Sequence, residues 1–336
     1  MCGIFGSISV NRNLNINKKL FLNSLSLLSH RGPDDEGHFI DNKIAFGHKR
    51  LSIIDLSKGG HQPMFSYNKS SVITYNGEIY NYNQLKEELK NKGYKFKNKT
   101  DTEVLLNGLI DEGPNFITKC NGMFAFAFHN KNMKTSYIFR DRVGIKPLFY
   151  SIDNQKITFS SNLKAIASYF QYRNRIDQES ISSYFSFRQP LGNKTFFKNI
   201  YSLEPGHYIE IKNNKINIKK YWDQKKFFLQ NKLDKGEDYY TEKLSELVQS
   251  SVKYRLISDV KVASLLSGGL DSTIIASIIN KQIRKNFLAY SIGYSYKDYN
   301  EFKYSKLVAK KLNMNHKIIS TDAENYFNDM NELIKL

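Results

Sequence analysis

The sequence predicts two regions of different fold class: an α+β region of stacked, mostly antiparallel sheets, followed by an α/β region with a doubly wound parallel sheet. Residues 1–212 contain many short strand patterns and few helices, which is typical of stacked antiparallel sheets. From residue 237 to residue 336, strand and helix patterns alternate, which is typical of a parallel sheet. Residues 213–236, which include a lysine-rich stretch of weak periodicity, are predicted to form a linker.

The first region begins with an apolar strand pattern at residues 3–10. Asn17 is a candidate N-cap for a helix through residue 28 that carries Phe21, Leu25 and Leu28 on one face. Further helices are expected to begin at residues 81 and 100. Further strands are expected at residues 44–54, 72–75, 123–128, 136–140, 148–151 and 156–160, before a turn at 204–207 and a hairpin at 213–214.

The second region contains a long amphipathic helix pattern and then three strand patterns separated by helices. Strands of this spacing, joined by helices, form parallel βαβ units. The helices are expected at residues 238–256, 271–283 and 301–312, and the strands at 260–266, 287–293 and 316–319.

Composition excludes several classes of protein. The net charge of +18 comes from 50 basic and 32 acidic residues, but the lysines are scattered, which favours attraction to anionic substrates over nucleic-acid binding. Two cysteines make no disulfide framework, and Cys120 is expected to be a buried small residue. The sequence shows no signal peptide and no membrane-spanning apolar run, so a cytoplasmic protein is expected.

Cys2 is a candidate nucleophile. Removal of Met1 would leave a thiol and a free α-amine on one residue, and an amine with a pKa near ~8 can accept the thiol proton at neutral pH. Gly3 leaves the backbone open to a substrate. The alternative is an incidental cysteine at a flexible terminus.

A second candidate site is the segment 267–272 (SGGLDS), which follows an apolar strand and opens a helix. Gly268 and Gly269 permit a tight turn with outward-facing N–H groups, and Ser267 and Ser272 add hydroxyl donors suited to a phosphate. Asp271 would repel phosphate unless Mg²⁺ lies between them. No Walker A ending is present, and the alternative is an ordinary strand-to-helix turn.

Taken together, several motifs resemble those of the glutamine-hydrolysing asparagine synthetase family, which is a class II glutamine amidotransferase family. The resemblance extends through essentially the whole chain. It implies an N-terminal-nucleophile glutaminase fold with αββα layers, followed by a partial ATP-pyrophosphatase-type domain. The matching segments are residues 1–6 (MCGIFG), 30–34 (HRGPD), 50–53 (RLSI), 76–81 (NGEIYN), 141–148 (DRVGIKPL) and 267–272.

The resemblance implies that Cys2 attacks the side-chain amide of glutamine, giving a glutamyl thioester and ammonia. Asn76 and the N–H of Gly77 would form the oxyanion hole. Arg50 would hold the glutamine α-carboxylate. The α-amine would be held by Asp101 with Glu78 nearby, beside Ile53 and Ile54. Without the resemblance, Arg50 and Asp101 would be interpreted as a surface charge and a helix cap.

For the second region, the resemblance implies that ATP and aspartate form β-aspartyl-AMP, which ammonia converts to asparagine. Leu266 and Ile292 would contact adenosine, although both could equally be core residues. The pyrophosphate part with Mg²⁺ would be held by Ser267, Gly268, Gly269, Asp271 and Ser272, with Asp271 as the metal ligand.

Two departures from the family pattern affect these expectations. Asn162 stands where the family has an acidic residue after a serine. Relatives also continue with a further loop and a catalytic lysine beyond residue 336, so we expect a glutaminase that makes no asparagine alone at a useful rate, with apolar sheet faces left uncovered. A homodimer, or a partner chain that supplies the remaining half, stays open.

Two other functions also stay open. One is a stand-alone glutaminase, or an amidotransferase with another carboxylate or sugar acceptor. The other is a non-catalytic interaction module that uses its basic surface.

Overall fold

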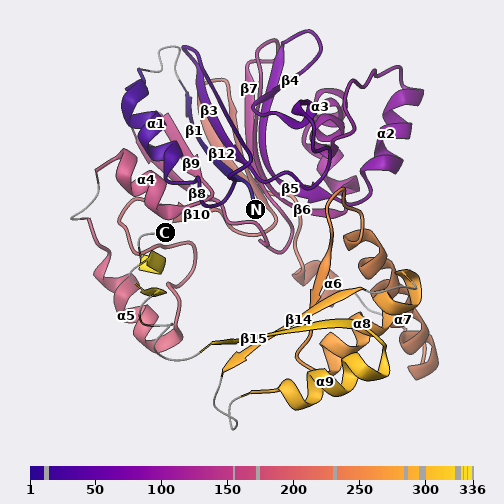
Figure 1. The fold of residues 1–336 in the computed structure, drawn as a ribbon. Coiled ribbons are helices and arrows are strands. Elements are labelled where there is room, and N and C mark those ends of the chain that lie inside the picture. Colours follow the sequence, from indigo (N-terminus) through magenta and orange to yellow (C-terminus); the bar gives the residue numbers. More distant parts are fainter. Residues whose placement is uncertain are drawn as a thin grey trace. The chain divides into compact units, whose positions relative to one another are not determined.

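The computed structural model describes residues 1–10, 15–153, 156–171, 175–229, 233–283, 287–294, 300–321, 327, 329–330 and 332–334. It divides into two units, Met1–Gln230 and Asn231–Leu336 (Figure 1). The segment 213–236 contains β12 (Lys215–Lys220), which pairs with β11 (His207–Lys212), and α6 (Lys225–Phe228). Residues 230–232 of that segment lie outside the described residues.

Two six-stranded antiparallel sheets form the first unit. The first sheet has the order β10-β8-β9-β1-β3-β2 and the second has the order β12-β11-β7-β6-β5-β4. The strands of the first sheet are β1 (Gly3–Ser9), β2 (Asp35–Ile40), β3 (Ile44–Arg50), β8 (Phe149–Asp153), β9 (Lys156–Ser160) and β10 (Tyr201–Ser202). Those of the second, besides β11 and β12, are β4 (Met64–Phe65), β5 (Ser71–Ile79), β6 (Gly122–Asn130) and β7 (Thr135–Arg140).

Helices cover the outer face of each sheet, which gives four layers in the order α, β, β, α (Figure 1). On the first sheet, α1 (Lys18–Ser26) and α4 (Leu163–Tyr169) share a buried cluster with Phe5 of β1. On the second, α2 (Tyr82–Asn91) and α3 (Asp101–Glu112) pack over β5, β6 and β7. The predicted αββα fold is therefore confirmed. The remaining helical elements are α5 (Gln178–Phe187) and the 3-10 turns η1 (Lys58–Gly60) and η2 (Gly113–Lys119).

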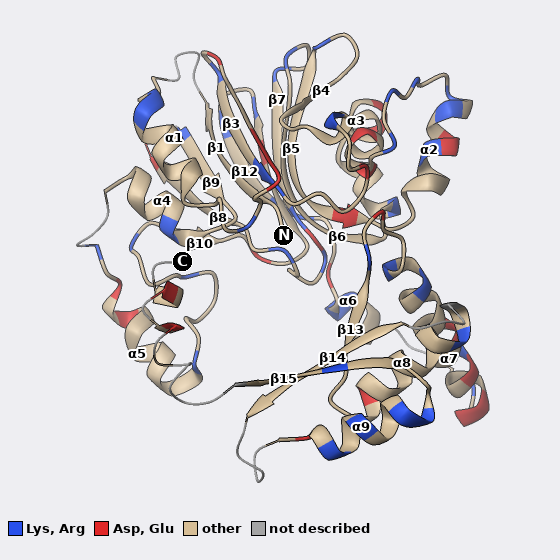
Figure 2. Cartoon of the chain, in the orientation of Figure 1, with Lys and Arg blue, Asp and Glu red and all other residues tan. Residues whose placement is uncertain are grey.

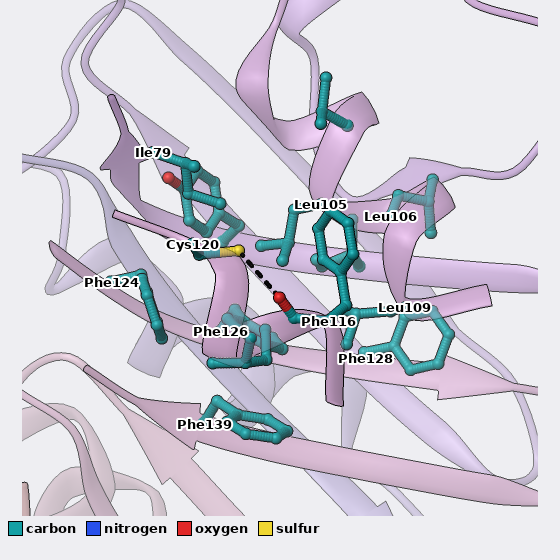
Figure 3. Close-up of a cluster of buried hydrophobic side chains, with 14 of the residues drawn as sticks. Ile79, Leu105, Leu106, Leu109, Phe116, Cys120, Phe124, Phe126, Phe128 and Phe139 are labelled. Atoms are coloured by element: carbon teal, nitrogen blue, oxygen red, sulfur yellow. Dashed lines mark hydrogen bonds between the residues drawn. The ribbon is translucent and has the colours of Figure 1, made fainter. Parts of the chain in front are cut away.

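Alternating small and large side chains on β6 create two different cores. Ala125 and Ala127 face the first sheet, whereas Phe124, Phe126 and Phe128 face α3 and η2 (Figure 3). The predicted burial of Cys120 is confirmed, because its thiol lies among these rings and donates to the carbonyl oxygen of Phe116 at 3.5 Å. Successive side chains of a strand point to opposite faces. The alanines of β6 can therefore pack between the two sheets, while its phenylalanines pack beneath the helices.

Several element boundaries differ from the prediction. The strand expected at 44–54 ends at Arg50, because residues 51–57 turn around the Arg50 side chain. The helix expected through residue 28 ends at Ser26, although Leu28 is buried as expected. The elements β2, β4, α4 and α5 were not expected from the sequence.

A three-stranded parallel sheet forms the centre of the second unit, as predicted. Its order is β13 (Ala263–Leu265), β14 (Leu288–Tyr294) and β15 (Asn315–Thr321). Helices α8 (Leu270–Ile283) and α9 (Phe302–Lys311) meet β14 through the small residues Ala276, Ala289 and Ala309. Helix α7 (Glu237–Arg255) packs on α8 through Val252 and Ile279.

The opposite face of this sheet exposes apolar side chains, as expected from the sequence. Leu265, Ile292 and Tyr294 are 69%, 64% and 51% exposed. Ala289 and Ser291, which point to the other face of β14, are buried. Only one face of the sheet is therefore covered by described helices.

Charged residues do not gather on one element. Figure 2 shows lysines and arginines spread over helices, strands and turns of both units, with acidic residues among them. Among the described helices, none is long and apolar enough to cross a membrane.

The Phe126→Ala variant should lower the free energy of unfolding of the first unit by ~3–5 kcal/mol, because it leaves a cavity in the aromatic cluster. Phe185→Ala, at a ring that is 82% exposed, should change it by less than about 0.5 kcal/mol. Urea unfolding followed by Trp222 fluorescence tests this, since the chain has one tryptophan and it lies in this unit. Equal losses in both variants would contradict the assigned core.

Candidate active site

One cavity of about 170 Å³ lies where several elements of the first unit end or begin. Cys2 directly precedes β1, Arg50 is the last residue of β3, and Asp101 is the first residue of α3. The cavity brings together every residue that the sequence assigned to the glutaminase site, and these residues are Cys2, Arg50, Ile53, Ile54, Asn76, Gly77, Glu78 and Asp101.

Cys2 is held at the cavity wall by its neighbours. The Leu51 N–H donates to its sulfur at 3.3 Å, and the Arg31 Nε donates to its carbonyl oxygen at 3.1 Å. Burial raises the pKa of the Cys2 thiol, while the Leu51 hydrogen bond, the N-terminal amine, Arg50 and Lys146 act in the opposite direction. Burial lowers the pKa of the Met1 α-amine, which favours the neutral form that can accept a proton.

Arg50 is buried rather than a surface charge. Its guanidinium donates to the carbonyl oxygens of Ser57 at 2.9 Å, Ile54 at 3.3 Å and Asp55, so it fixes the loop that follows β3. A side chain at position 60 would strike this group, since a Cβ there would lie 1.8 Å from the Arg50 Nη2. Gly60 therefore leaves room for the guanidinium beside the cavity.

Asp101 is buried at the first turn of α3, where Thr100 is the N-cap. One carboxylate oxygen accepts from the Tyr75 hydroxyl at 2.7 Å and from the Ile79 N–H at 2.9 Å. Burial raises the pKa of the Asp101 carboxyl. Burial, followed by the neighbouring Asp101 charge, also raises the pKa of Glu78. Two carboxyl groups thus line one small cavity, and a bound cation would stabilise both as carboxylates.

Asn76 lies in β5 and is 1% exposed. Its amide nitrogen is buried and donates to no residue that the structure describes. Gly77, the next residue, cannot carry a side chain, because a Cβ would lie 2.4 Å from the Met123 carbonyl oxygen on β6. A buried donor without a partner is costly, so this amide is available to a group that enters the cavity.

Polar residues of the cavity that were not assigned to a site from the sequence include Gln62, Tyr75 and Lys146. Gln62 accepts from the Tyr75 N–H at 2.7 Å, and Tyr75 holds Asp101. Lys146 lies in the motif at 141–148 and is buried in the same cavity. That motif was the available signal for Lys146, whereas no sequence pattern marked Gln62.

In the second unit, a pocket of about 350 Å³ lies at the carboxyl ends of β13 and β14. Leu266, Ser267 and Ile292 line it together with α9 residues such as Phe302. Leu266 is also a core residue, with 1% exposure, whereas Ile292 is largely exposed. This is the edge at which doubly wound sheets bind ligands.

The loop before α8 differs from the prediction in its hydrogen bonding. The N–H groups of Gly268 and Gly269, expected to face outward, donate to the hydroxyls of Ser272 at 3.3 Å and Ser267 at 3.2 Å. The two hydroxyls lie 3.0 Å apart. Because serine side chains can satisfy nearby backbone donors, a phosphate would have to replace these bonds. Asp271 is exposed on the first turn of α8.

The described residues contain no group of three or more His, Cys, Asp or Glu side chains placed to hold a metal ion. Asp271 is the acidic residue of the loop, so a metal held there would need further ligands such as water or phosphate oxygens.

Two family models match this chain. Residues 1–222 match the glutamine amidotransferase domain, and residues 243–336 match asparagine synthase. Asparagine synthetase (glutamine-hydrolyzing) 3 of Bacillus subtilis is 35% identical over 308 residues, which cover 89% of this chain and 49% of that protein. Asparagine synthetase B of Escherichia coli is 31% identical over 284 residues, which cover 84% and 45%.

Asparagine synthetase (glutamine-hydrolyzing) 1 of Bacillus subtilis is 35% identical over 311 residues, which cover 92% of this chain and 48% of that protein. The chain spans about half the length of these relatives. The match to the first model extends over the two sheets and the cavity described above. The chain therefore belongs to the glutamine amidotransferase family, and an asparagine synthase domain follows its amidotransferase domain.

Proposed function

We propose that this chain hydrolyses glutamine to glutamate and ammonia, and that Cys2 is the nucleophile. The observation that carries this proposal is one cavity that joins Cys2, the buried Arg50, the buried Asp101, the half-buried Glu78, and an amide donor that has no acceptor among the described residues. The names of its relatives, glutamine-hydrolyzing asparagine synthetases, support the choice of glutamine. We expect the enzyme to act in the cytoplasm.

The charges of the cavity match those of an amino acid. Arg50 would bind the α-carboxylate of glutamine, for which a guanidinium fork is suited. Asp101 and Glu78 would bind the α-ammonium group, whose positive charge would favour their ionised forms. Ile53 and Ile54 would contact the apolar part of the substrate.

In the first step, the Cys2 thiolate attacks the side-chain amide carbon, and a C–S bond forms as the carbonyl becomes an oxyanion. Asn76 and the Gly77 N–H would donate to that oxyanion. The C–N bond then breaks and ammonia leaves with the proton that the α-amine had taken from the thiol. This requires the amine on Cys2 itself, and hence removal of Met1. Water then hydrolyses the thioester to glutamate and restores the thiol.

Glutamine hydrolysis by the purified chain, together with its intact mass, tests the proposal. Cys2→Ala should lower the rate by at least ~10³-fold, because it removes the proposed nucleophile. Cys120→Ala removes a thiol that is 1% exposed and lies outside the cavity, and it should retain hydrolysis. A chain without Met1 that releases no glutamate, or a Cys2→Ala variant that stays active, would contradict the proposal.

Asn76→Ala should lower kcat for glutamine by ~10²–10³-fold and change KM little, because the lost donor acts on the oxyanion and not on the bound amide. Asn107→Ala is the matched control, since Asn107 is also a buried asparagine but does not line the cavity. Steady-state kinetics distinguish the two. A rise in KM alone at Asn76 would assign this residue to substrate binding instead.

For the second unit, we propose that the loop 267–272 binds the pyrophosphate part of ATP, and that the domain contributes to the activation of aspartate as β-aspartyl-AMP for conversion to asparagine. The support is the loop's place at the carboxyl edge of the sheet and the match to asparagine synthase. Leu266 and Ile292, which line the pocket of the second unit, would contact adenosine. The phosphates would be bound by Ser267, which also lines that pocket, and by the loop residues Gly268, Gly269 and Ser272.

A magnesium ion fits this proposal, because Asp271 is an exposed carboxylate beside the phosphate donors and Mg²⁺ commonly uses one or two carboxylates plus phosphate oxygens. It would neutralise phosphate charge next to Asp271.

Gly268→Ala should weaken binding of Mg-ATP at least ~10-fold, because Gly268 has φ +90° and a Cβ would lie 2.5 Å from the Tyr304 carbonyl carbon. Gly236→Ala is the control: Gly236 has φ +82°, but no atom of the described residues lies within 4 Å of a Cβ there, so the change adds the backbone strain without the clash. Isothermal titration calorimetry gives both affinities. An unchanged affinity in Gly268→Ala would count against the loop as the phosphate site.

A further inference from the structure

Lys146 is a buried lysine whose ammonium has no partner in the described chain. Its side chain is among the buried residues, and its Nζ forms no hydrogen bond or ion pair with any residue that the structure describes. The backbone around it is held firmly: its N–H donates to the Asp141 carboxylate at 2.9 Å, and its carbonyl oxygen accepts from the Arg140 Nε at 3.0 Å. The position of Lys146 therefore does not depend on its ammonium.

The Asp141 carboxylate organises the whole turn after β7. Besides Lys146, it accepts from the N–H groups of Phe124, Val143 and Ile145 at 3.2, 3.2 and 2.9 Å. Four backbone donors on one carboxylate fix the turn against β6. This turn places Lys146 in the wall of the cavity that is also lined by Cys2 and Glu78.

The charged groups that face Cys2 and Glu78 are few. The cations are the N-terminal amine, Arg31, Arg50 and Lys146, and the anionic groups are Glu78, Asp101 and the thiolate itself. Tyr75 is uncharged and bonded to Asp101. Arg50 is bonded to three carbonyl oxygens, and Arg31 to the carbonyl oxygen of Cys2. Lys146 is thus the buried side-chain cation of the described cavity that is bonded to no other group.

We propose that Lys146 is a positioning residue of this site, and that its ammonium holds the Cys2 thiolate and the Glu78 carboxylate in their charged forms. A buried ammonium favours nearby anions because the surrounding dielectric constant is low. In agreement, Lys146 lowers the pKa of both groups, whereas burial raises them. Burial lowers the pKa of Lys146 itself, while Glu78 and then Cys2 raise it.

This role would match the two tasks of the cavity. A thiolate is the reactive form of cysteine, and a charged Glu78 is the form that binds an α-ammonium group. Without Lys146, the cavity would hold the same anionic groups with one cation fewer, so both groups would keep their protons to a higher pH. The expected effect of Lys146 on turnover rests on the proposed glutaminase function. Its effect on the Cys2 thiolate can be measured without any turnover.

The test is the pH dependence of Cys2 alkylation by iodoacetamide, followed by intact mass in the full chain. Lys146→Met keeps an unbranched side chain, one atom shorter, and removes its charge. It should raise the apparent pKa of Cys2 by about one unit, so that alkylation below that pKa becomes about tenfold slower. Cys120 should not react, since it is buried and burial raises its pKa to about 12; Cys2→Ala gives the background rate.

Two variants separate charge from structure. Lys146→Arg keeps the positive charge and should keep the apparent pKa within about 0.3 units of the unchanged chain. Lys49→Met removes an equally buried ammonium that pairs with Glu36 and does not line the cavity, and it should also leave the pKa of Cys2 nearly unchanged. Trp222 fluorescence during urea unfolding shows whether each variant folds.

The alkylation experiment can fail or succeed independently of the test of glutamine hydrolysis. A Lys146→Met variant that folds and has an unshifted alkylation profile would overturn the inference, even if the unchanged chain hydrolyses glutamine. An equal shift in Lys49→Met would overturn it too, since the effect would then be one of net charge. If the chain hydrolyses glutamine, the acidic limb of kcat/KM should move to higher pH in Lys146→Met but not in Lys146→Arg. If the chain does not hydrolyse glutamine, the alkylation profile still shows whether Lys146 stabilises the Cys2 thiolate.

Discussion

Two buried hydrogen bonds join the sheets of the first unit at the end where the cavity lies. The Thr74 hydroxyl donates to the Gly47 carbonyl oxygen at 3.2 Å, and the His48 Nε2 lies 3.1 Å from the Tyr75 carbonyl oxygen. Burial lowers the pKa of His48 to about 3, so the ring is neutral at physiological pH and its Nε2 must carry the proton that it donates. These bonds fix β3 against β5. They thereby position Asn76, the residue after Tyr75 on β5, and Arg50, which lies two residues beyond His48 on β3.

The site follows from where these fixed strands end. The cavity lies at the ends of β3 and β5 and at the start of α3. Backbone N–H and C=O groups at the ends of strands lack partners in the sheet, so they can form hydrogen bonds with charged side chains instead. Asp101 accepts the Ile79 N–H in this way, and Arg50 takes the carbonyl oxygens of the loop after β3. The charged side chains that would bind a substrate, Arg50 and Asp101, therefore also form hydrogen bonds with the backbone at the ends of these strands.

The sequence was sufficient for the strands of the sandwich because their alternation is strong: the Phe-Ala alternation of β6 allows no other period. The sequence did not predict α5, because aromatic residues such as Phe185 remain exposed and the helix has no clear buried face. It also did not predict the end of β3, because the hydrogen bonds of the Arg50 side chain, rather than local propensity, turn the chain there. The site residues were found through motifs. Gln62 was missed because its contact is with the backbone of a strand 13 residues away, and such contacts leave no local pattern.

The two candidate sites differ in how far they are prepared for a ligand. In the first unit, the Asn76 amide is buried without an acceptor among the described residues, so a substrate oxyanion would gain a hydrogen bond without displacing another. In the second unit, Gly268 and Gly269 already donate to serine hydroxyls, so phosphate oxygens would have to exchange with bonds that exist. Exchange of this kind yields less net free energy than a first hydrogen bond to an unsatisfied donor. Electrostatic attraction from the helix N-terminus and a cation beside Asp271 would then have to supply most of the affinity of that loop.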